Sequence, residues 1–191
     1  MNSTTGPDAT RYVEVETTHV EMLSPDDLKP APTTALTVIE AELPCPELNR
    51  FLYSAVGGRW YWVDRLDWTY AKWLDYLDCD TMHTCIGYVR GTPAGYFEAE
   101  QQADGDIEIR SFGLLPQFHG HGYGGDLLTR AVRFAWALGT RRVWLHTCSL
   151  DSPRGLQNYL ARGFQIFRVD RQIVPMPPAP PGPWPGSEYD V

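Results

Sequence analysis

The stretch "PQFHGHGYGGDLL", residues 116–128, decides the fold, because it sets four glycines directly before a leucine-rich segment. The first N–H groups of a helix have no partner within the helix and carry partial positive charge, so they bind phosphate. Glycines leave that backbone open to a ligand. The stretch therefore predicts a phosphate-binding loop before a helix over residues 122–138, which Gly139 ends. The apolar stripe of this helix consists of Leu127, Leu128, Ala131, Ala135 and Leu138.

Two common phosphate-binding motifs do not fit this stretch. A P-loop requires Gly-Lys-Ser/Thr, and no lysine is present. Gly120, Gly122 and Gly125 satisfy the dinucleotide-binding pattern G-x-G-x-x-G letter by letter. That motif should follow the first strand of a parallel βαβ unit and precede an acidic residue by ~20 positions. Here it comes late in the chain, and residues 145–147 read Leu-His-Thr at the expected acidic position, so we reject a dinucleotide fold.

Three strand-like runs precede the glycines, near residues 83–90, 94–101 and 106–114. The turn sequences RGTPAG and ADGD join them, which predicts an antiparallel meander. Pro46 suits the first position of a helix, and Gly57 and Gly58 are expected to end it at residue 56. Further expected elements are strands at 11–20, 36–41, 141–147 and 164–174, and a helix over 151–163 that Asp151 or Ser152 caps, with Pro153 in its first turn.

Tryptophan and tyrosine crowd residues 60–76. Trp73, Tyr76 and Leu77 share one helical face, which predicts core packing. Residues 60–62 follow two glycines and are less helical. They leave two interpretations open, either packing in the core or a loop that faces a substrate.

Residues 83–170 resemble a GCN5-related N-acetyltransferase (GNAT). In that family a strand ends before proline, and a loop Gln/Arg-x-x-Gly-x-Gly/Ala leads into a leucine-rich helix. Residues 114–116, Leu-Leu-Pro, match the strand end, and the loop fits in frames that start at Gln117 or at His119. The frame that starts at His119 aligns GGDLL better with the start of the family's helix, but it has His where Gln or Arg is usual. Residues 156–164, LQNYLARGF, resemble the family's Leu-Tyr-x-x-x-Gly-Phe.

The resemblance implies an α+β fold. Its central sheet is mixed, mostly antiparallel and twisted, with six to seven strands that about four helices flank. The sheet splays between the fourth and fifth core strands of the family, here the strands that end near Leu114 and Thr147. Residues 1–174 are expected to form one acyltransferase domain. Residues 175–191 are expected to form a proline-rich tail that is extended or disordered.

The resemblance also implies acetyl-CoA, or another acyl-CoA, as co-substrate. Its pantetheine arm would pair with the backbone of Phe112 and Leu114, and the Leu114 N–H would face the thioester oxygen. One such donor contributes on the order of 3 kcal/mol to an acyl-transfer transition state. Ser152 or Asp151 stands near the family's usual asparagine, and we assign Ser152 to the cofactor. The diphosphate is expected on the amides of His119, Gly120, His121, Gly122, Tyr123 and Gly124.

An amine attacks a thioester only when it is neutral, so a base must remove a proton, and the departing thiolate gains from an acid. Tyr159 lies at the family's usual acid position and is our predicted acid. The base is Glu108, on the strand before the glycine loop, or His146, at the end of the next strand. The structural alternatives are a core tyrosine, a solvated strand carboxylate, and a core or surface histidine.

Trp60, Trp62, Asp64 and Trp68 are predicted to bind the acceptor, because a carboxylate beside aromatic rings holds an ammonium group. A surface ion pair of Asp64 with Arg65 is the alternative. The predicted activity is acyl-CoA-dependent N-acetyl transfer to the amine of a small molecule, directly and through a tetrahedral intermediate. Two alternatives remain, a non-catalytic acyl-CoA sensor and an amide-forming enzyme that uses another acyl carrier.

The bulk composition limits partners and location. The formal net charge is −8 and the pI about 5.0, which argues against binding to a phosphate backbone. The four cysteines form neither a CxxC pair nor zinc-like spacing, so we expect no metal and reduced thiols. No signal-peptide or membrane-span pattern is present, so we expect a cytoplasmic protein without a membrane partner. A homodimer is compatible with the sequence.

Overall fold

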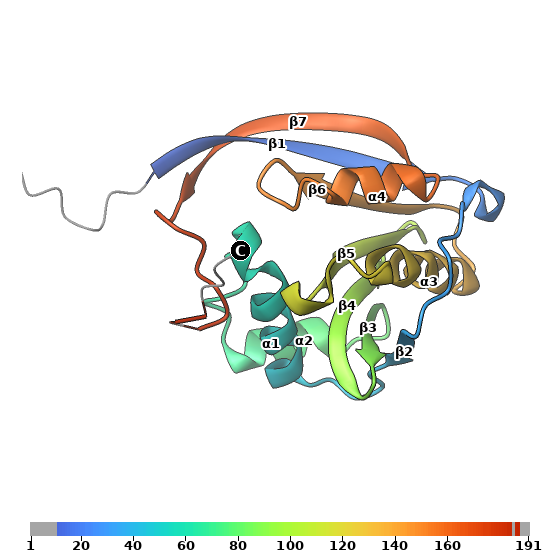
Figure 1. Cartoon of the computed structure of the whole chain (residues 1–191). Coiled ribbons are helices and arrows are strands. Elements are labelled where there is room, and N and C mark those ends of the chain that lie inside the picture. Colours follow the sequence, from blue (N-terminus) through green and yellow to red (C-terminus); the bar gives the residue numbers. More distant parts are fainter. Residues whose placement is uncertain (1–10, 185, 188–191) are drawn as a thin grey trace, which may run out of the picture.

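The protein contains one central seven-stranded sheet in the computed structural model, which describes residues 11–184 and 186–187 (Figure 1). The strand order is β2-β3-β4-β5-β6-β1-β7. All neighbouring strands pair antiparallel except β5 and β6, which are parallel. The strands are β1 (Arg11–Met22), β2 (Thr37–Glu40), β3 (Met82–Val89), β4 (Thr92–Gln101), β5 (Ile107–Leu114), β6 (Val143–Cys148) and β7 (Gln165–Met176).

Helices cover both faces of this sheet. On β4, Phe97 packs in the cluster with α3 and Tyr96 packs in the cluster with α1, so successive residues face opposite layers. α3 and α4 therefore lie on one face, and α1 and α2 on the other. The helices are α1 (Pro46–Gly57), α2 (Tyr70–Leu77), α3 (Tyr123–Ala137) and α4 (Gly155–Ala161), with the 3-10 turns η1 (Pro25–Asp27), η2 (Gly58–Trp60) and η3 (Pro116–Phe118).

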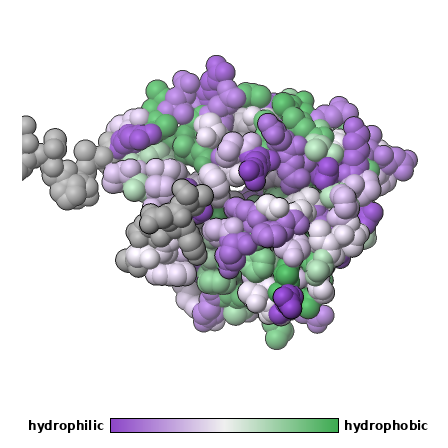
Figure 2. Space-filling model, in the orientation of Figure 1, coloured by the Kyte–Doolittle hydropathy of each residue, from purple (hydrophilic) through white to green (hydrophobic). Residues whose placement is uncertain are grey.

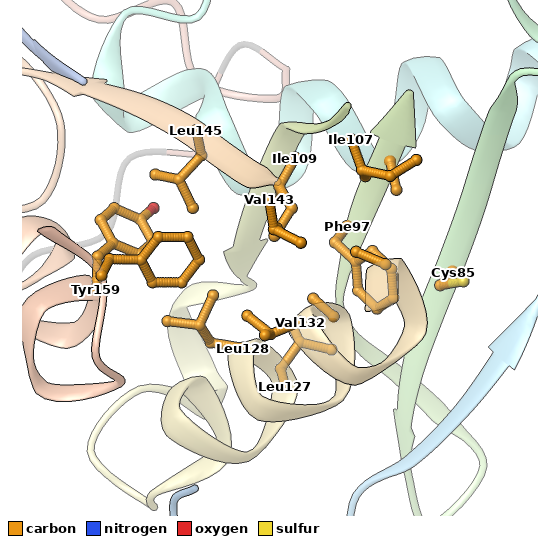
Figure 3. Packing of buried hydrophobic residues seen from close by; sticks show 14 of the residues in the cluster. Cys85, Phe97, Ile107, Ile109, Leu127, Leu128, Val132, Val143, Leu145 and Tyr159 are labelled. Carbon is orange, nitrogen blue, oxygen red and sulfur yellow. The ribbon is translucent and has the colours of Figure 1, made fainter. Parts of the chain in front are cut away.

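The predicted stripe of α3 forms the centre of the main core. Leu127 and Leu128 are fully buried, and Figure 3 shows them facing Val143 of β6 and Phe97 of β4. Leu138, the last residue of the stripe, lies beyond the helix and is exposed. The periodic apolar pattern thus fixes which face of α3 meets the sheet.

The parallel pair β5 and β6 splays apart after a short contact. Its residue pairs are Ile107 with Val143 and Glu108 with Trp144. The Leu115 N–H donates to the Ala94 carbonyl at 2.9 Å, which marks a hydrogen-bonded pair of the β4–β5 ladder. Such pairs alternate, so the N–H groups of Phe112 and Leu114 point away from β4 and toward the gap beside β6.

The expected elements are present, with differences at three places. α4 begins at Gly155 rather than near residue 151, and residues 151–154 form a turn in which the Ser152 Oγ accepts from the Arg154 N–H at 3.4 Å. β7 extends through Pro175 and Met176, so these two residues do form part of a sheet ladder. Proline is tolerated there because β7 is an edge strand. The expectations for residues 1–10, 185 and 188–191 lie outside the described residues.

The third difference concerns the glycine pair after α1. Both residues keep helical dihedral angles, so they do not end the helix by adopting a left-handed turn. A Cβ on Gly57 would overlap the Trp62 ring, and one on Gly58 would lie 2.8 Å from the carbonyl carbon of Gly182. The two glycines therefore serve close approach by other parts of the chain.

Figure 2 shows apolar residues on the upper surface, over β1 and β7, among mainly polar neighbours. Ile166, Val169 and Ile173 of β7 are exposed there. All four cysteines are free. In the part of the chain that the structure describes, no helix has the length and apolar character needed to cross a membrane.

Leu127→Ala should lower the free energy of unfolding by about 3 kcal/mol, because it removes fully buried methyl groups and leaves a cavity. Leu43→Ala is the matched control, since Leu43 is 80% exposed and should change stability by less than about 0.5 kcal/mol. Urea unfolding of both variants measures the difference. Equal effects would contradict this placement of α3.

Candidate active site

A cavity of about 350 Å³ fills the gap between β5 and β6. Phe112 and Leu114 line it from β5, and His146 lines it from β6. Tyr159 of α4 and Trp62, which follows α1, complete the wall. We call this space the donor cavity. Its remaining described lining residues are Val56, Trp60, Ile109, Arg110, Gly113, His119, Gly120, Gly124, Gly125, Leu145, Thr147, Asp151, Ser152, Arg154, Gly155 and Asn158.

The glycine-rich loop delivers the N-terminus of α3 to one end of the donor cavity. Gly120 and Gly122 both have φ of +81°, a conformation that favours glycine. The first helical bond joins the Asp126 N–H to the Gly122 carbonyl, and no side chain caps the helix. The N–H groups of the first turn therefore remain available to an anion.

The predicted cofactor residues fall into two groups. Phe112, Leu114, His119, Gly120, Gly124 and Ser152 all line the donor cavity. His121, Gly122 and Tyr123 are not among its described lining residues. The rings of His121 and Tyr123 stack at 5.9 Å, and the His119 Nε2 lies 3.1 Å from the Leu114 carbonyl, which ties the loop to β5.

The charge next to the helix N-terminus is compensated locally. Asp126 in the first turn accepts from the N–H and Oγ1 of Thr34 and from the Arg130 Nε. Burial raises the pKa of Asp126, but these hydrogen bonds and the Arg130 charge outweigh it and lower the pKa below its usual value. These partners partly neutralise the carboxylate, so it would repel an anion at the N-terminus of α3 less strongly.

Sequence reasoning missed Arg154 and Asn158 in the region of α4, and it left Asp151 as the alternative to Ser152. Arg154 and Asn158 line the cavity, and the Asn158 Nδ2 donates to the Gly124 carbonyl at 3.2 Å. Asp151 accepts from the Thr147 Oγ1 at 2.9 Å, the Cys148 N–H at 3.0 Å and the Trp62 Nε1 at 3.1 Å. The spacing of Arg154 and Asn158, one helical turn apart and next to Tyr159, was the available signal.

Tyr159 enters the cavity from α4. Its ring lies 5.9 Å from that of Phe112, and Figure 3 shows its hydroxyl oxygen directed toward Leu145. Burial, with a smaller contribution from the Asp151 carboxylate, raises the pKa of Tyr159. The hydroxyl therefore keeps its proton and acts as a hydrogen-bond donor.

Glu108 and His146 form a pair across the point where β5 and β6 part. The Glu108 Oε1 lies 3.3 Å from the His146 Nδ1, and the two side chains are 3% and 44% exposed. The Glu108 Oε2 accepts from the Arg110 Nη1 at 3.0 Å and the Gln102 Nε2 at 3.2 Å. Burial raises the pKa of Glu108, but His146 and Arg110 outweigh that effect and lower it. Glu108 lines neither cavity described in this section, whereas His146 lines both.

A second cavity of about 600 Å³ adjoins the first, and we call it the acceptor cavity. All four predicted acceptor residues, Trp60, Trp62, Asp64 and Trp68, line it. The two cavities meet at residues that line both of them, namely Trp60, Trp62, Arg110, His146 and Asp151.

A buried carboxylate network supports the aromatic wall of the acceptor cavity. Glu98 is fully buried and accepts from the Arg65 Nη1 at 2.8 Å, the Tyr76 hydroxyl at 3.0 Å, the Ser111 hydroxyl at 2.9 Å and the Asn49 Nδ2 at 2.9 Å. Arg65 is thus part of a buried ion pair with Glu98, not of a surface pair with Asp64.

The same guanidinium organises the aromatic rings around it. Its central carbon lies 4.5 Å from the ring centroid of Tyr76, 5.2 Å from that of Trp68 and 5.5 Å from that of Tyr53. Glu98 neutralises Arg65, and Glu108 neutralises Arg110. The negative charges of Asp64 and Asp151, which also line the acceptor cavity, are therefore not offset by these two arginines.

Residues 45–164 match the sequence model of the Acetyltransferase (GNAT) family, which covers more than half of the chain. This chain belongs to the GNAT acetyltransferase family. No curated protein matches it in sequence. The GNAT assignment agrees with the seven-stranded sheet and with the glycine loop at the start of α3.

Solved structures share the GNAT fold at low sequence identity. A GCN5-related N-acetyltransferase from Kribbella flavida is 19% identical, with a TM-score of 0.60, covering 87% of this chain and 60% of that one. Another from Sphaerobacter thermophilus is 18% identical, with a TM-score of 0.58 and coverages of 89% and 54%. The chain thus spans less than two thirds of the length of these relatives.

AAC(6')-Iy in complex with the bisubstrate analog CoA-S-monomethyl-acetylneamine is 18% identical, with a TM-score of 0.52, covering 69% of this chain and 92% of that one. At these identities the likenesses show the fold. The splayed strand pair that the sequence predicted is confirmed as part of that fold, and it is β5 and β6.

Gly124→Val should raise the Kd for acetyl-CoA by at least about tenfold, because the new side chain projects from the first turn of α3 into the donor cavity. Ala137→Val, at the exposed end of the same helix, is the matched control and should leave the Kd unchanged. Isothermal titration calorimetry measures both. A folded Gly124→Val protein with parental affinity would contradict the assignment of the anion site.

The lowered pKa of Glu108 has a consequence for acid stability. Its ionised form contributes stability that is present above the ordinary glutamate pKa of 4.5 and is lost as the pH falls through the lower folded pKa. Glu108→Gln should therefore weaken the loss of stability on acidification, whereas the exposed control Glu42→Gln should not. Urea unfolding from about pH 6 to pH 3 checks this, and indistinguishable acid profiles of parent and Glu108→Gln would contradict it.

Proposed function

We propose that the protein is an acetyl-CoA-dependent N-acetyltransferase whose acceptor is the amine of a small molecule. One observation carries the proposal: a donor cavity beside an open helix N-terminus joins an aromatic acceptor cavity at His146. That arrangement would bring a thioester and an amine together at a side chain that can accept a proton.

The residues of the donor cavity suit acetyl-CoA. The uncapped first turn of α3 would hold the diphosphate, and Arg154 lies in the same cavity. The outward-facing N–H groups of Phe112 and Leu114 would pair with the pantetheine arm along the open edge of β5. No lysine or arginine lies between Arg110 and Arg130, so Arg154 and Arg162, which flank α4, are cations that would complement the loop. The Arg162 Nη1 lies 2.9 Å from the place that a Cβ on Gly125 would take.

The reacting amine must be neutral when it attacks, and it loses one further proton once its nitrogen has bonded to the thioester carbon. Acetyl-CoA supplies the thioester: the new C–N bond forms first and gives the tetrahedral intermediate, whose C–S bond then breaks. His146 would take the proton from the amine, while the Glu108 carboxylate at 3.3 Å holds its Nδ1 side and stabilises the charged ring. Tyr159 would donate a hydrogen bond to the departing sulfur, a role that fits its raised pKa better than full proton transfer.

The acceptor cavity supports a bulky, positively charged amine. Its volume of about 600 Å³ exceeds that of the donor cavity, and rings from Trp60, Tyr61, Trp62 and Trp68 line it. Asp64 makes no ion pair within the described residues, so its carboxylate is available to an ammonium group. Polar side chains, among them Thr17, Ser111 and Gln172, also line this cavity and would bind polar groups of a small molecule.

His146→Gln and Tyr159→Phe should each lower kcat by about 100-fold, because the first removes the base and the second removes the hydrogen bond to the departing sulfur, while the Kd for acetyl-CoA stays close to the parental value. Tyr12→Phe and His83→Gln, which lie outside both cavities, are the matched controls. Turnover on a panel of primary amines, together with calorimetry, separates chemistry from binding.

The same measurements distinguish the two alternatives. A parent protein that binds acetyl-CoA but acetylates no amine in a broad panel would be an acyl-CoA sensor. A parent that does not bind acetyl-CoA by calorimetry would draw its acyl group from another carrier. Full activity in His146→Gln would remove this residue from the role of base.

A further inference from the structure

The last strand ends on one wall of the acceptor cavity. Gln172, Val174, Pro175 and Met176 line the cavity, and Met176 is buried. The opposite wall is formed by residues 60–64, which follow α1. The two walls come from distant parts of the sequence. The distance between them, and hence the ligands that fit, therefore depends on contacts that join the two segments.

After Met176 the chain crosses from the first wall to the second. The Gly182 N–H donates to the Gly58 carbonyl at 3.3 Å, two residues before Trp60. A Cβ on Gly58 would have as its nearest neighbours three backbone atoms of Gly182, at 2.8–3.1 Å. Figure 1 shows this segment descending from the end of β7 toward α1. The two backbones touch, and a residue larger than glycine does not fit between them.

The end of this segment forms a turn of its own. The Trp184 N–H donates to the Ser187 Oγ at 3.4 Å, the Ser187 N–H donates to the Trp184 carbonyl at 3.1 Å, and Ser187 is buried. Gly182 has φ of +63°, a backbone conformation that favours glycine. Five prolines lie within residues 177–183, so the free segment has few conformations to lose when it docks.

We propose that residues 177–184, which we call the strap, determine acceptor specificity by fixing the distance between the two walls of the acceptor cavity. The inference rests on the proposed function of that cavity. The strap holds the aromatic wall through Gly58 and holds the β7 wall through its covalent continuation from Met176. Amines too large for the fixed gap are rejected, and slim amines are held closely by both walls.

Gly58→Ala tests the strap without changing a cavity residue, since Gly58 lines neither cavity. Gly58 has φ of −59° and ψ of −28°, so alanine suits its backbone and the variant should fold. The added methyl group displaces the Gly182 backbone. Ala179→Gly is the matched control, because it alters an exposed residue in the same segment.

The first readout does not depend on activity. Cys148 lines the acceptor cavity, Cys85 is buried, and Cys45 and Cys79 are replaced by serine in all variants. The rate of Cys148 alkylation by a bulky maleimide, divided by the rate with iodoacetamide, reports the width of the cavity entrance. This ratio should rise in Gly58→Ala and stay at the parental value in Ala179→Gly. An unchanged ratio in Gly58→Ala would overturn the proposal.

The second readout is selectivity among amines. Gly58→Ala should raise kcat/KM for bulky amines relative to slim ones by about tenfold, at the lower end of the discrimination that steric fit provides. The KM for acetyl-CoA should not change. If the parent acetylates no amine, the proposed function fails, while the labelling ratio still tests whether the strap sets the width of the cavity. If the parent is active but both ratios are unchanged in Gly58→Ala, only the strap proposal fails.

Discussion

The pairing of β5 with β6 stops after two residue pairs, and the rest of the candidate site depends on that break. Continued parallel pairing would consume the backbone groups of both strands. Because the strands part, the N–H groups of Phe112 and Leu114 face a cavity instead of a neighbour. The same parting lets Tyr159 enter from α4, and it sets His146 two residues beyond the last paired position, where Glu108 reaches its Nδ1.

Two buried glutamates determine the electrostatic character of the neighbouring acceptor cavity. Burying a carboxylate is costly unless hydrogen bonds and an opposite charge compensate it, and Glu98 and Glu108 each have an arginine within 3.0 Å. Arg65 and Arg110 are thereby neutralised where they line the cavity. The aromatic rings together with the carboxylates of Asp64 and Asp151 then favour a cation over an anion in this cavity.

Much of the architecture was accessible from the sequence because its signals are local. The stripe of α3 and the turns of the meander are set by neighbours a few residues apart, and both are confirmed. The purpose of Gly57 and Gly58 was not accessible, since it depends on Trp62 and on Gly182, distant in the chain. Glu98 alternates like any strand residue, and only the packing of α2 and residues 60–68 shows it to be buried. The position of Asp151 between the two cavities likewise follows from a turn that the sequence pattern assigned to a helix.

A crystal structure of the protein with acetyl-CoA tests the central claim most directly. The account predicts the diphosphate oxygens at hydrogen-bond distance, about 3 Å, from the N–H groups of the first turn of α3. It also predicts the pantetheine arm along Phe112 and Leu114, with the acetyl group near His146. A nucleotide bound elsewhere, with β5 and β6 closed against each other and the α3 N-terminus covered by side chains, would contradict it.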